Sequence, residues 1–173
     1  MKTVIAPVVL LFSSLLLLAE TKNPVSDVAR EILPRQQKNL IAAAEAMPAE
    51  KYDFKPTPEQ MSFARLVIHI AESNDHLCAK ISDTPEPQST EAKESDAKDA
   101  LVSRLKASFD FCSSSLAKLE DAKLGDTVDL FGGRQGPKAL ALFALTNDWA
   151  DHYSAAAMYL RLNGILPPTA KKK

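Results

Sequence analysis

Apolar residues recur at helical spacing in four long segments of this chain, and this pattern limits the fold more than any other feature. In the second segment one helix face would carry Phe63, Leu66, Ile70, Leu77 and Ile81. Only 5 of the 173 residues are glycine, so little in the sequence would interrupt long helices. The predicted helices cover residues 24–47, 59–82, 94–120 and 137–163.

Several residues mark where these helices should begin, bend or end. Ser26 is predicted to cap the first helix, and Pro34 is expected either to kink that helix or to end a short lead-in. Pro137 suits the first turn of the last helix. Gly164 is the left-handed residue expected just after its end.

Four amphipathic helices of this length favour an all-α four-helix bundle. The polar connection 83–93 could span ~35 Å if it is extended, which is about the length of a bundle helix. It is therefore predicted to be a long crossover that leaves the second and third helices parallel. Tyr52 and Phe54 are expected to anchor the first loop, and residues 127–130 to form a short extended piece.

Residues 1–19, "MKTVIAPVVLLFSSLLLLA", have the layout of a secretory signal peptide: Lys2, then an apolar run, then Ala19 before the cut. The apolar run is short for a membrane span, which needs ~20 residues. Leu17 is larger than the small residue usual near a cleavage site, so an uncleaved membrane anchor is the alternative. The sequence therefore divides into a signal at 1–19, a domain at 20–168 and a basic tail at 169–173.

Export would place the protein in the periplasm or outside the cell, and this changes what its two cysteines mean. In an oxidising compartment Cys78 and Cys112 can pair, and parallel second and third helices would bring them to a similar height. The alternative is two reduced cysteines that act as small core residues.

The charge pattern excludes one class of partner. The formal net charge is −1, and the chain has neither a glycine-rich phosphate loop nor a basic and aromatic pattern for nucleic acid. A nucleic-acid partner is therefore not expected, and a membrane partner only if the signal is uncleaved.

The last helix carries the most informative polar residues. Asp148 and His152 stand four residues apart on its apolar side, where a carboxylate needs a partner. The same spacing lets one helix offer two ligands to one metal ion. A zinc site wants at least three protein ligands, and His69, at the flank of the second helix's apolar stripe, could supply the third. His76 lies ~10 Å further along that helix, too far to share an ion with His69 comfortably. As an alternative to metal binding, Asp148 could simply fix the tautomer of His152.

Three stretches resemble the DinB/YfiT-like family: residues 42–74, residues 151–168, and "VDLFGGRQGPKALAL" at 128–142. The resemblance extends over residues 24–168. It implies a four-helix bundle of up-down-down-up topology and a metal-dependent activity, in some members the transfer of groups to or from small thiols. It also implies one metal-binding histidine on the second helix and a His-x₃-His pair on the last.

His69 and His152 match that pattern, and Asp148 stands where the family has its middle histidine. Two histidines and a carboxylate can hold zinc, nickel, iron or manganese and leave positions open to water and substrate. The first hypothesis is an exported metal-dependent hydrolase or thiol-linked transferase acting on an unknown small molecule. The alternative is a metal-free, non-catalytic bundle that binds a partner.

Two further expectations concern the surroundings of this site. Glu72, one turn from His69, could orient that histidine or could simply be a solvated carboxylate. The outer face of the last helix has small residues that would let another helix approach, and the resembled family often dimerises, so a homodimer is expected; the alternative is packing against the N-terminal helix. These small residues are Asn147, Ala150, Ser154 and Ala157.

Overall fold

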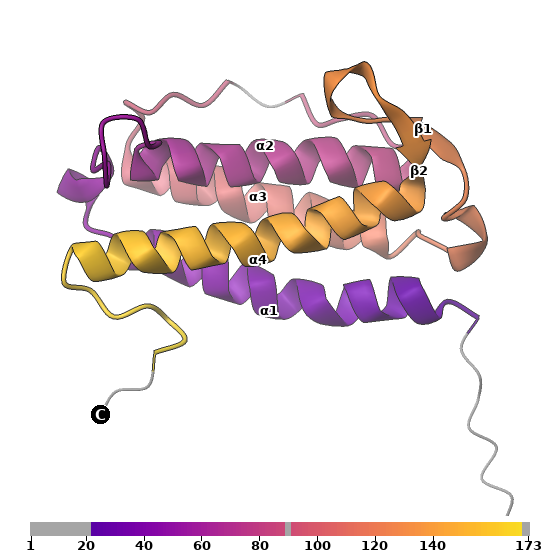
Figure 1. Cartoon of the computed structure of the whole chain (residues 1–173), viewed down its shortest axis with the longest axis horizontal. Coiled ribbons are helices and arrows are strands. Elements are labelled where there is room, and N and C mark those ends of the chain that lie inside the picture. Colours follow the sequence, from indigo (N-terminus) through magenta and orange to yellow (C-terminus); the bar gives the residue numbers. More distant parts are fainter. Residues whose placement is uncertain (1–21, 89–90, 171–173) are drawn as a thin grey trace, which may run out of the picture.

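The computed structural model describes residues 22–88 and 91–170, and Figure 1 shows long helices packed side by side with a small hairpin at one end. The predicted signal at 1–19 and the end of the basic tail, 171–173, lie outside the described residues. The mostly helical fold is confirmed, with a two-stranded sheet in addition. The helices are α1 (Pro24–Ala46), α2 (Phe63–Ser82), α3 (Lys98–Leu116) and α4 (Lys138–Leu162), and the strands are β1 (Thr127–Asp129) and β2 (Gln135–Pro137).

The four helices enclose one core. Helix α2 packs against α3 and α4, and α1 packs against the same two helices from the other side. In Figure 1 the chain after α2 runs back along the bundle before α3 begins. The largest fully buried side chains include Trp149, Phe63, Phe109, Leu40, Met47, Ile68, Ile70, Ile81, Leu101 and Leu105. No helix in the described part of the chain is both long and apolar enough to cross a membrane.

Helix α2 begins four residues later than predicted, because Ser62 caps it. The Ser62 Oγ accepts a hydrogen bond from the Arg65 N–H at 3.0 Å, which satisfies one of the free amides of the first turn. The predicted start at residue 59 was therefore wrong. The expected left-handed residue after α4 is confirmed, since Gly164 has φ of 73°.

Helix α3 is shorter than predicted at both ends, covering Lys98–Leu116 in place of 94–120. At its start, the Lys93 N–H donates to Asp96 Oδ2 at 2.9 Å, which holds a turn before the helix. Beyond its end, Leu119 is buried although it lies in a turn. The apolar spacing therefore continues past the last helical residue and misplaces the predicted boundary.

The start of α1 is capped by a residue from a distant part of the chain. Asp121 Oδ2 accepts from the Val25 N–H, and its Oδ1 accepts from the Ser26 N–H, both at 2.8 Å. The Ser26 hydroxyl also donates to Oδ1, at 2.6 Å. The prediction that Ser26 caps α1 was wrong: the helix begins at Pro24, and Ser26 is a buried residue inside it. Pro34 lies inside α1, and the helix continues beyond it. Of the two expectations for this proline, the end of a short lead-in segment is therefore excluded.

Replacing Asp121 by alanine should lower the thermal midpoint by about 3 °C, because three hydrogen bonds to the first turn of α1 are lost. Burial alone would raise the pKa of Asp121, but the hydrogen bonds from Ser26 and Val25 and the charge of Arg30 lower that pKa below its usual value. The carboxylate therefore stabilises the fold above about pH 4, and this contribution is lost as the pH falls through its lowered pKa.

Thermal unfolding of wild type and Asp121→Ala at pH 7 and below pH 4 would measure this effect, with the exposed neighbour Glu120→Ala as the matched control. The difference between wild type and Asp121→Ala should shrink at the lower pH. Equal midpoints for the two variants at pH 7 would contradict the capping role.

The first loop is anchored as predicted. Tyr52 is buried and its hydroxyl donates to the Ala44 carbonyl at 2.8 Å. Its ring meets that of Phe63 edge-on, with the centroids 5.2 Å apart, and Phe54 meets Tyr159 in the same way at 6.2 Å. These contacts attach the loop to the end of the bundle where α4 finishes.

A buried polar network crosses the centre of the bundle and fixes the rotation of α4. The Trp149 Nε1–H donates to Asn74 Oδ1 at 2.6 Å, and the Asn74 Nδ2–H donates to Ser108 Oγ at 3.0 Å. The bonds join α4, α2 and α3. One turn away, Cys78 and Cys112 form a disulfide with their Cα atoms 5.2 Å apart, so of the two alternatives for the cysteines the paired one is found.

Candidate metal centre

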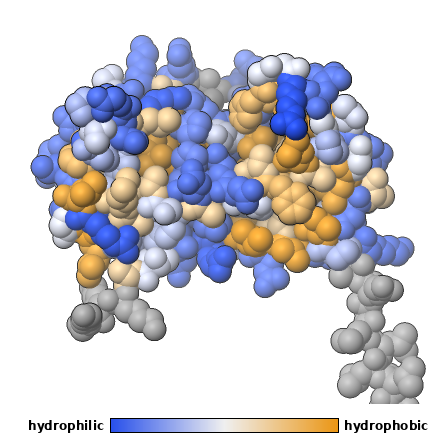
Figure 2. All heavy atoms as spheres, viewed as in Figure 1, coloured by the Kyte–Doolittle hydropathy of each residue, from blue (hydrophilic) through white to orange (hydrophobic). Residues whose placement is uncertain are grey.

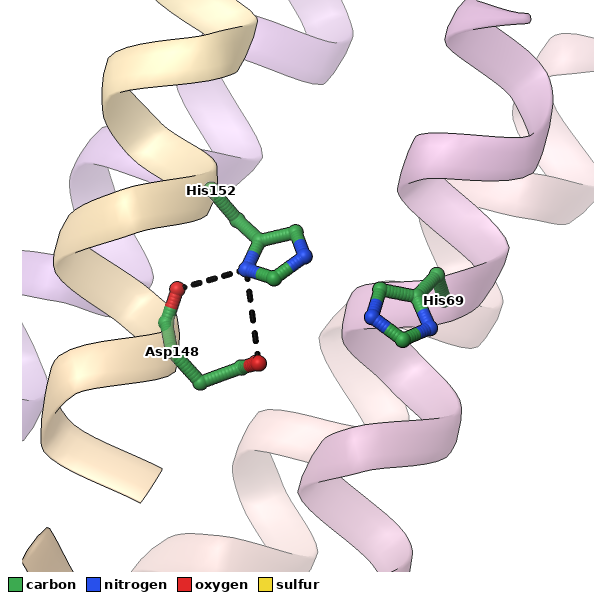
Figure 3. A group of neighbouring side chains, drawn as sticks. All are labelled: His69, Asp148 and His152. Atoms are coloured by element: carbon green, nitrogen blue, oxygen red, sulfur yellow. Dashed lines mark hydrogen bonds and ion pairs between the residues drawn. The ribbon is translucent and has the colours of Figure 1, made fainter. Parts of the chain in front are cut away.

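The three predicted ligand residues meet between α2 and α4. His69 comes from α2, and Asp148 and His152 come from successive turns of α4, all three directed into the same space (Figure 3). One possible ligand atom from each residue lies within 4.8 Å of those of the other two. The two imidazole rings are 4.8 Å apart between centroids, at 44° to each other. A single ion could therefore contact all three side chains.

The neighbours of these residues explain why they point there. Trp149 is fully buried, and its bond to Asn74 holds that side of α4 against the core. Asp148 precedes it by ~100° around the helix, which turns the carboxylate toward the edge of α2. On α2, Ile68 and Ile70 are buried while His69 between them is partly exposed. The triad thus lies at the rim of the core, where polar side chains can still reach solvent.

Hydrogen bonding inside the triad leaves groups free for an ion. His152 Nδ1 is 2.7 Å from the backbone carbonyl of Asp148 and 3.4 Å from Asp148 Oδ1. A carbonyl can only accept, so Nδ1 carries the hydrogen, and in the neutral ring the lone pair is then on Nε2. The closer backbone carbonyl, more than the carboxylate, therefore fixes the tautomer.

The Asp148 carboxylate is only partly satisfied by hydrogen bonds within the described part of the chain. Asp148 Oδ2 is buried and makes no hydrogen bond with any residue that the structure describes. A buried carboxylate oxygen without a partner destabilises a fold by about 1–3 kcal/mol. A cation at this point would satisfy it, so the residues present fit a divalent metal ion.

Burial disfavours the charged forms of two of the three side chains, Asp148 and His69. Burial is the largest cause of the raised pKa of Asp148, opposed by the nearby imidazoles of His152 and His69 and reinforced by Asp151. Burial is also the largest cause of the lowered pKa of His69, and His152 adds to it while Asp148 opposes it. A neutral imidazole has the lone pair that a metal needs, and a bound cation would favour the ionised carboxylate.

Two other residues considered in the sequence do not join the triad. Glu72 binds Arg65, with Arg65 N–H groups 2.7 and 3.2 Å from its two carboxylate oxygens, so it does not orient His69. His76 stacks on Phe131, with ring centroids 4.1 Å apart, and its Nδ1 lies 3.4 Å from Glu86. Arg65 was not predicted to lie near the triad, although its spacing of four residues from His69 places it on the same helix face.

The triad is open to solvent at one side. The side chains of His152 and Asp148 are 13% and 19% exposed. Figure 2 shows hydrophilic side chains in the middle of this face, where α2 and α4 adjoin, and an apolar patch beside them over the first parts of α4 and α1. A cavity of about 590 Å³ lies elsewhere, beside the first part of α3, and is lined by Gln88, Glu91, Ala92, Lys93, Asp96, Ala100, Leu101 and Arg104. A ligand of the triad would therefore enter from its solvent-exposed side.

A helical bundle with two histidines and a carboxylate between facing helices defines a class of protein that can hold a metal in or near its core. Within that class, the DinB superfamily matches residues 32–153 of this chain. The chain belongs to the DinB superfamily. No curated protein matches its sequence.

Solved structures share the fold. A DinB-like protein from Bacillus subtilis has a TM-score of 0.67 at 21% identity, over 84% of this chain and 99% of that one. A DinB-like protein from Bacillus cereus has a TM-score of 0.67 at 15% identity, over 84% and 97%. A mutant mycothiol-dependent maleylpyruvate isomerase has a TM-score of 0.61 at 14% identity, over 75% of this chain and 59% of that one. At these identities the similarity concerns the fold alone.

Proposed function

We propose that this chain is an exported DinB superfamily protein with up-down-down-up helix topology that uses a divalent metal ion in hydrolysis or in thiol-linked group transfer. The ion, which we take to be zinc, nickel, iron or manganese, would be held by His69, Asp148 and His152. One observation carries the proposal. Three potential ligands from two helices converge within 4.8 Å, and the carboxylate among them has a buried oxygen that makes no hydrogen bond with the described residues.

When bound, such an ion would supply Lewis acidity to an oxygen or sulfur atom of the substrate. The protein's own contribution is orientation and charge. The Asp148 carbonyl holds the Nδ1–H of His152, which directs Nε2 into the site. The Asp148 carboxylate would neutralise part of the ion's charge, and the Trp149–Asn74 bond prevents α4 from rotating.

Two observations support export, and with it a periplasmic or secreted location. Residues 1–19 have the layout of a signal peptide, and the Cys78–Cys112 disulfide belongs to an oxidising compartment. In this proposal the mature domain is 20–168, followed by the basic tail 169–173. A membrane would be a partner only if the signal stayed attached.

The thiol-linked alternative is supported by the fold shared with a mycothiol-dependent isomerase, and the substrate is a small molecule in either case. A metal-free binding module is the second candidate function. It is favoured by the 3.4 Å separation of His152 Nδ1 and Asp148 Oδ1, which would allow these two residues to pair without an ion.

The proposal also includes a homodimer formed through α4. Asn147, Ala150 and Ser154 are exposed on this helix, whereas Ala157 is 6% exposed and belongs to the interior. The exposed surface formed by these short side chains therefore extends over two turns of α4. It would let the same helix of a second protein chain approach closely. Light scattering coupled to size-exclusion chromatography should give twice the monomer mass; a monomer at all concentrations would contradict this part of the proposal.

Elemental analysis of residues 20–173, purified without a histidine tag, tests metal binding directly. We expect about one ion per chain in the wild type and a loss of at least tenfold in His152→Ala, because two ligands alone bind too weakly to survive purification. The matched control is His76→Ala, which removes a histidine of α2 outside the triad and should keep the ion. A wild type that takes up none of the four metals would favour the metal-free binding module.

A further inference from the structure

A charged pair on α2 borders the candidate metal centre. Arg65, His69 and Glu72 are spaced by four and three residues, which places them on one face of the helix. Arg65 lies ~6 Å before His69 along the helix axis, and Glu72 lies ~4.5 Å after it. The side chains of Arg65 and Glu72 are 35% and 49% exposed. Both are therefore accessible to a molecule that approaches the triad from solvent.

The geometry of this pair is that of carboxylate recognition. Arg65 NH2 donates to Glu72 Oε2 at 2.7 Å, and NH1 donates to Oε1 at 3.2 Å. Two parallel N–H bonds to one planar carboxylate are the strongest arrangement that a guanidinium forms. Because Arg65 lies one turn before His69 on the same helix face, this carboxylate-binding fork borders the triad.

Glu72 can be replaced by another carboxylate at little cost. An exposed ion pair contributes little to stability, and among the residues that the structure describes only Arg65 donates hydrogen bonds to the Glu72 carboxylate. The pair between Arg104 and Asp75 is different, because the Asp75 side chain is only 4% exposed. The Arg104–Asp75 pair is therefore held inside the bundle, whereas the exposed Arg65 can exchange Glu72 for a carboxylate from solvent.

Charge also favours an anion beside the triad. A divalent ion beside the single carboxylate of Asp148 would leave one net positive charge, and Arg65 adds a second nearby. Glu72 balances that second charge only as long as it stays bound to Arg65. An incoming carboxylate would replace Glu72 as the negative charge paired with Arg65. The rest of the molecule would then lie next to His69.

We propose that Arg65 binds the substrate beside the triad and that the substrate is a small carboxylate, which displaces Glu72 from the guanidinium while its other end reaches the triad. This inference rests on the proposed metal-dependent function. It narrows the substrate to molecules with a carboxylate at one end, whatever bond the reaction changes.

Calorimetric titration of the zinc-loaded domain, residues 20–173, with succinate as the probe tests this inference. Arg65→Gln should weaken succinate binding about tenfold, because a charge-assisted bidentate contact is lost. Glu72→Gln should strengthen binding about threefold, because the competing carboxylate is removed. Arg35→Gln, which removes an exposed arginine of α1, should leave binding unchanged, and the uncharged diamide of succinate should not bind.

The zinc content of each sample separates the two possible failures. A wild type without zinc would overturn the proposed function, and the inference with it. Zinc at full content without succinate binding, or with binding equal in wild type and Arg65→Gln, would overturn the inference alone. Arg65→Lys keeps the charge but loses the fork, and it should bind with intermediate affinity, so the test stands even if Arg65→Gln folds poorly.

Discussion

Replacing Asp148 by alanine should weaken metal binding at least ~100-fold, since one of three protein ligands is removed from a site that needs them all. Asp148→His should bind zinc at least as tightly as the wild type, because a second imidazole would stand one turn from His152 on the face that points toward His69. Asp148→Asn keeps the shape and loses the charge, so its affinity should lie between. Competition with a chromophoric zinc chelator would measure the three affinities.

The matched control is Asp151→Ala, which removes an exposed carboxylate of the same helix and should change zinc affinity less than about threefold. Stability gives an independent readout. Without metal, Asp148→Ala should unfold at the same temperature as the wild type or higher, because a buried carboxylate oxygen without a hydrogen bond is removed. Wild-type zinc affinity combined with a lower thermal midpoint would show instead that Asp148 only supports His152.

The fold was predictable where local pattern and burial agree. The apolar face of α2 and the polar connection after it follow from spacing and composition alone, and the anchoring role of Tyr52 follows from an aromatic residue in a proline-bearing loop. The capping of α1 by Asp121 was not predictable, since the two are almost a hundred residues apart. Strand β2 was also missed, because "QGP" contains two residues that disfavour strands and forms one only by pairing with β1.

The candidate site was predictable as a set of residues but not as a set of contacts. Spacing on α4 places Asp148 beside His152, and the apolar stripe of α2 places His69 at its rim. No pattern could show that the backbone carbonyl of Asp148, rather than its carboxylate, is closer to His152 Nδ1. The pairing of Glu72 with Arg65 was missed because charged residues on a helix surface have several partners within reach, and only the three-dimensional structure selects one.

Removing the disulfide should have the largest effect on stability. The bond joins α2 to α3 across 34 residues, and closing a loop of that length stabilises a fold by about 3–4 kcal/mol through the entropy of the unfolded chain. The double variant Cys78→Ala/Cys112→Ala should therefore unfold about 10 °C lower than the oxidised wild type. Urea titration followed by tryptophan fluorescence would measure the free energy of unfolding, since Trp149 is the only tryptophan and is fully buried.

Reduction provides the matched control, because a reducing agent should destabilise the wild type to a similar degree and leave the double variant unchanged. The effect should also reach the candidate metal centre. Cys78 lies one turn from Asn74, whose side chain holds Trp149 beside Asp148, so a looser contact between α2 and α3 should weaken zinc binding in the variant. Protein made in a reducing cytosol should then be both less stable and poorer in metal than exported protein. Two free thiols in the folded, exported protein would contradict this account, because the stability of the bundle would then come from its core alone.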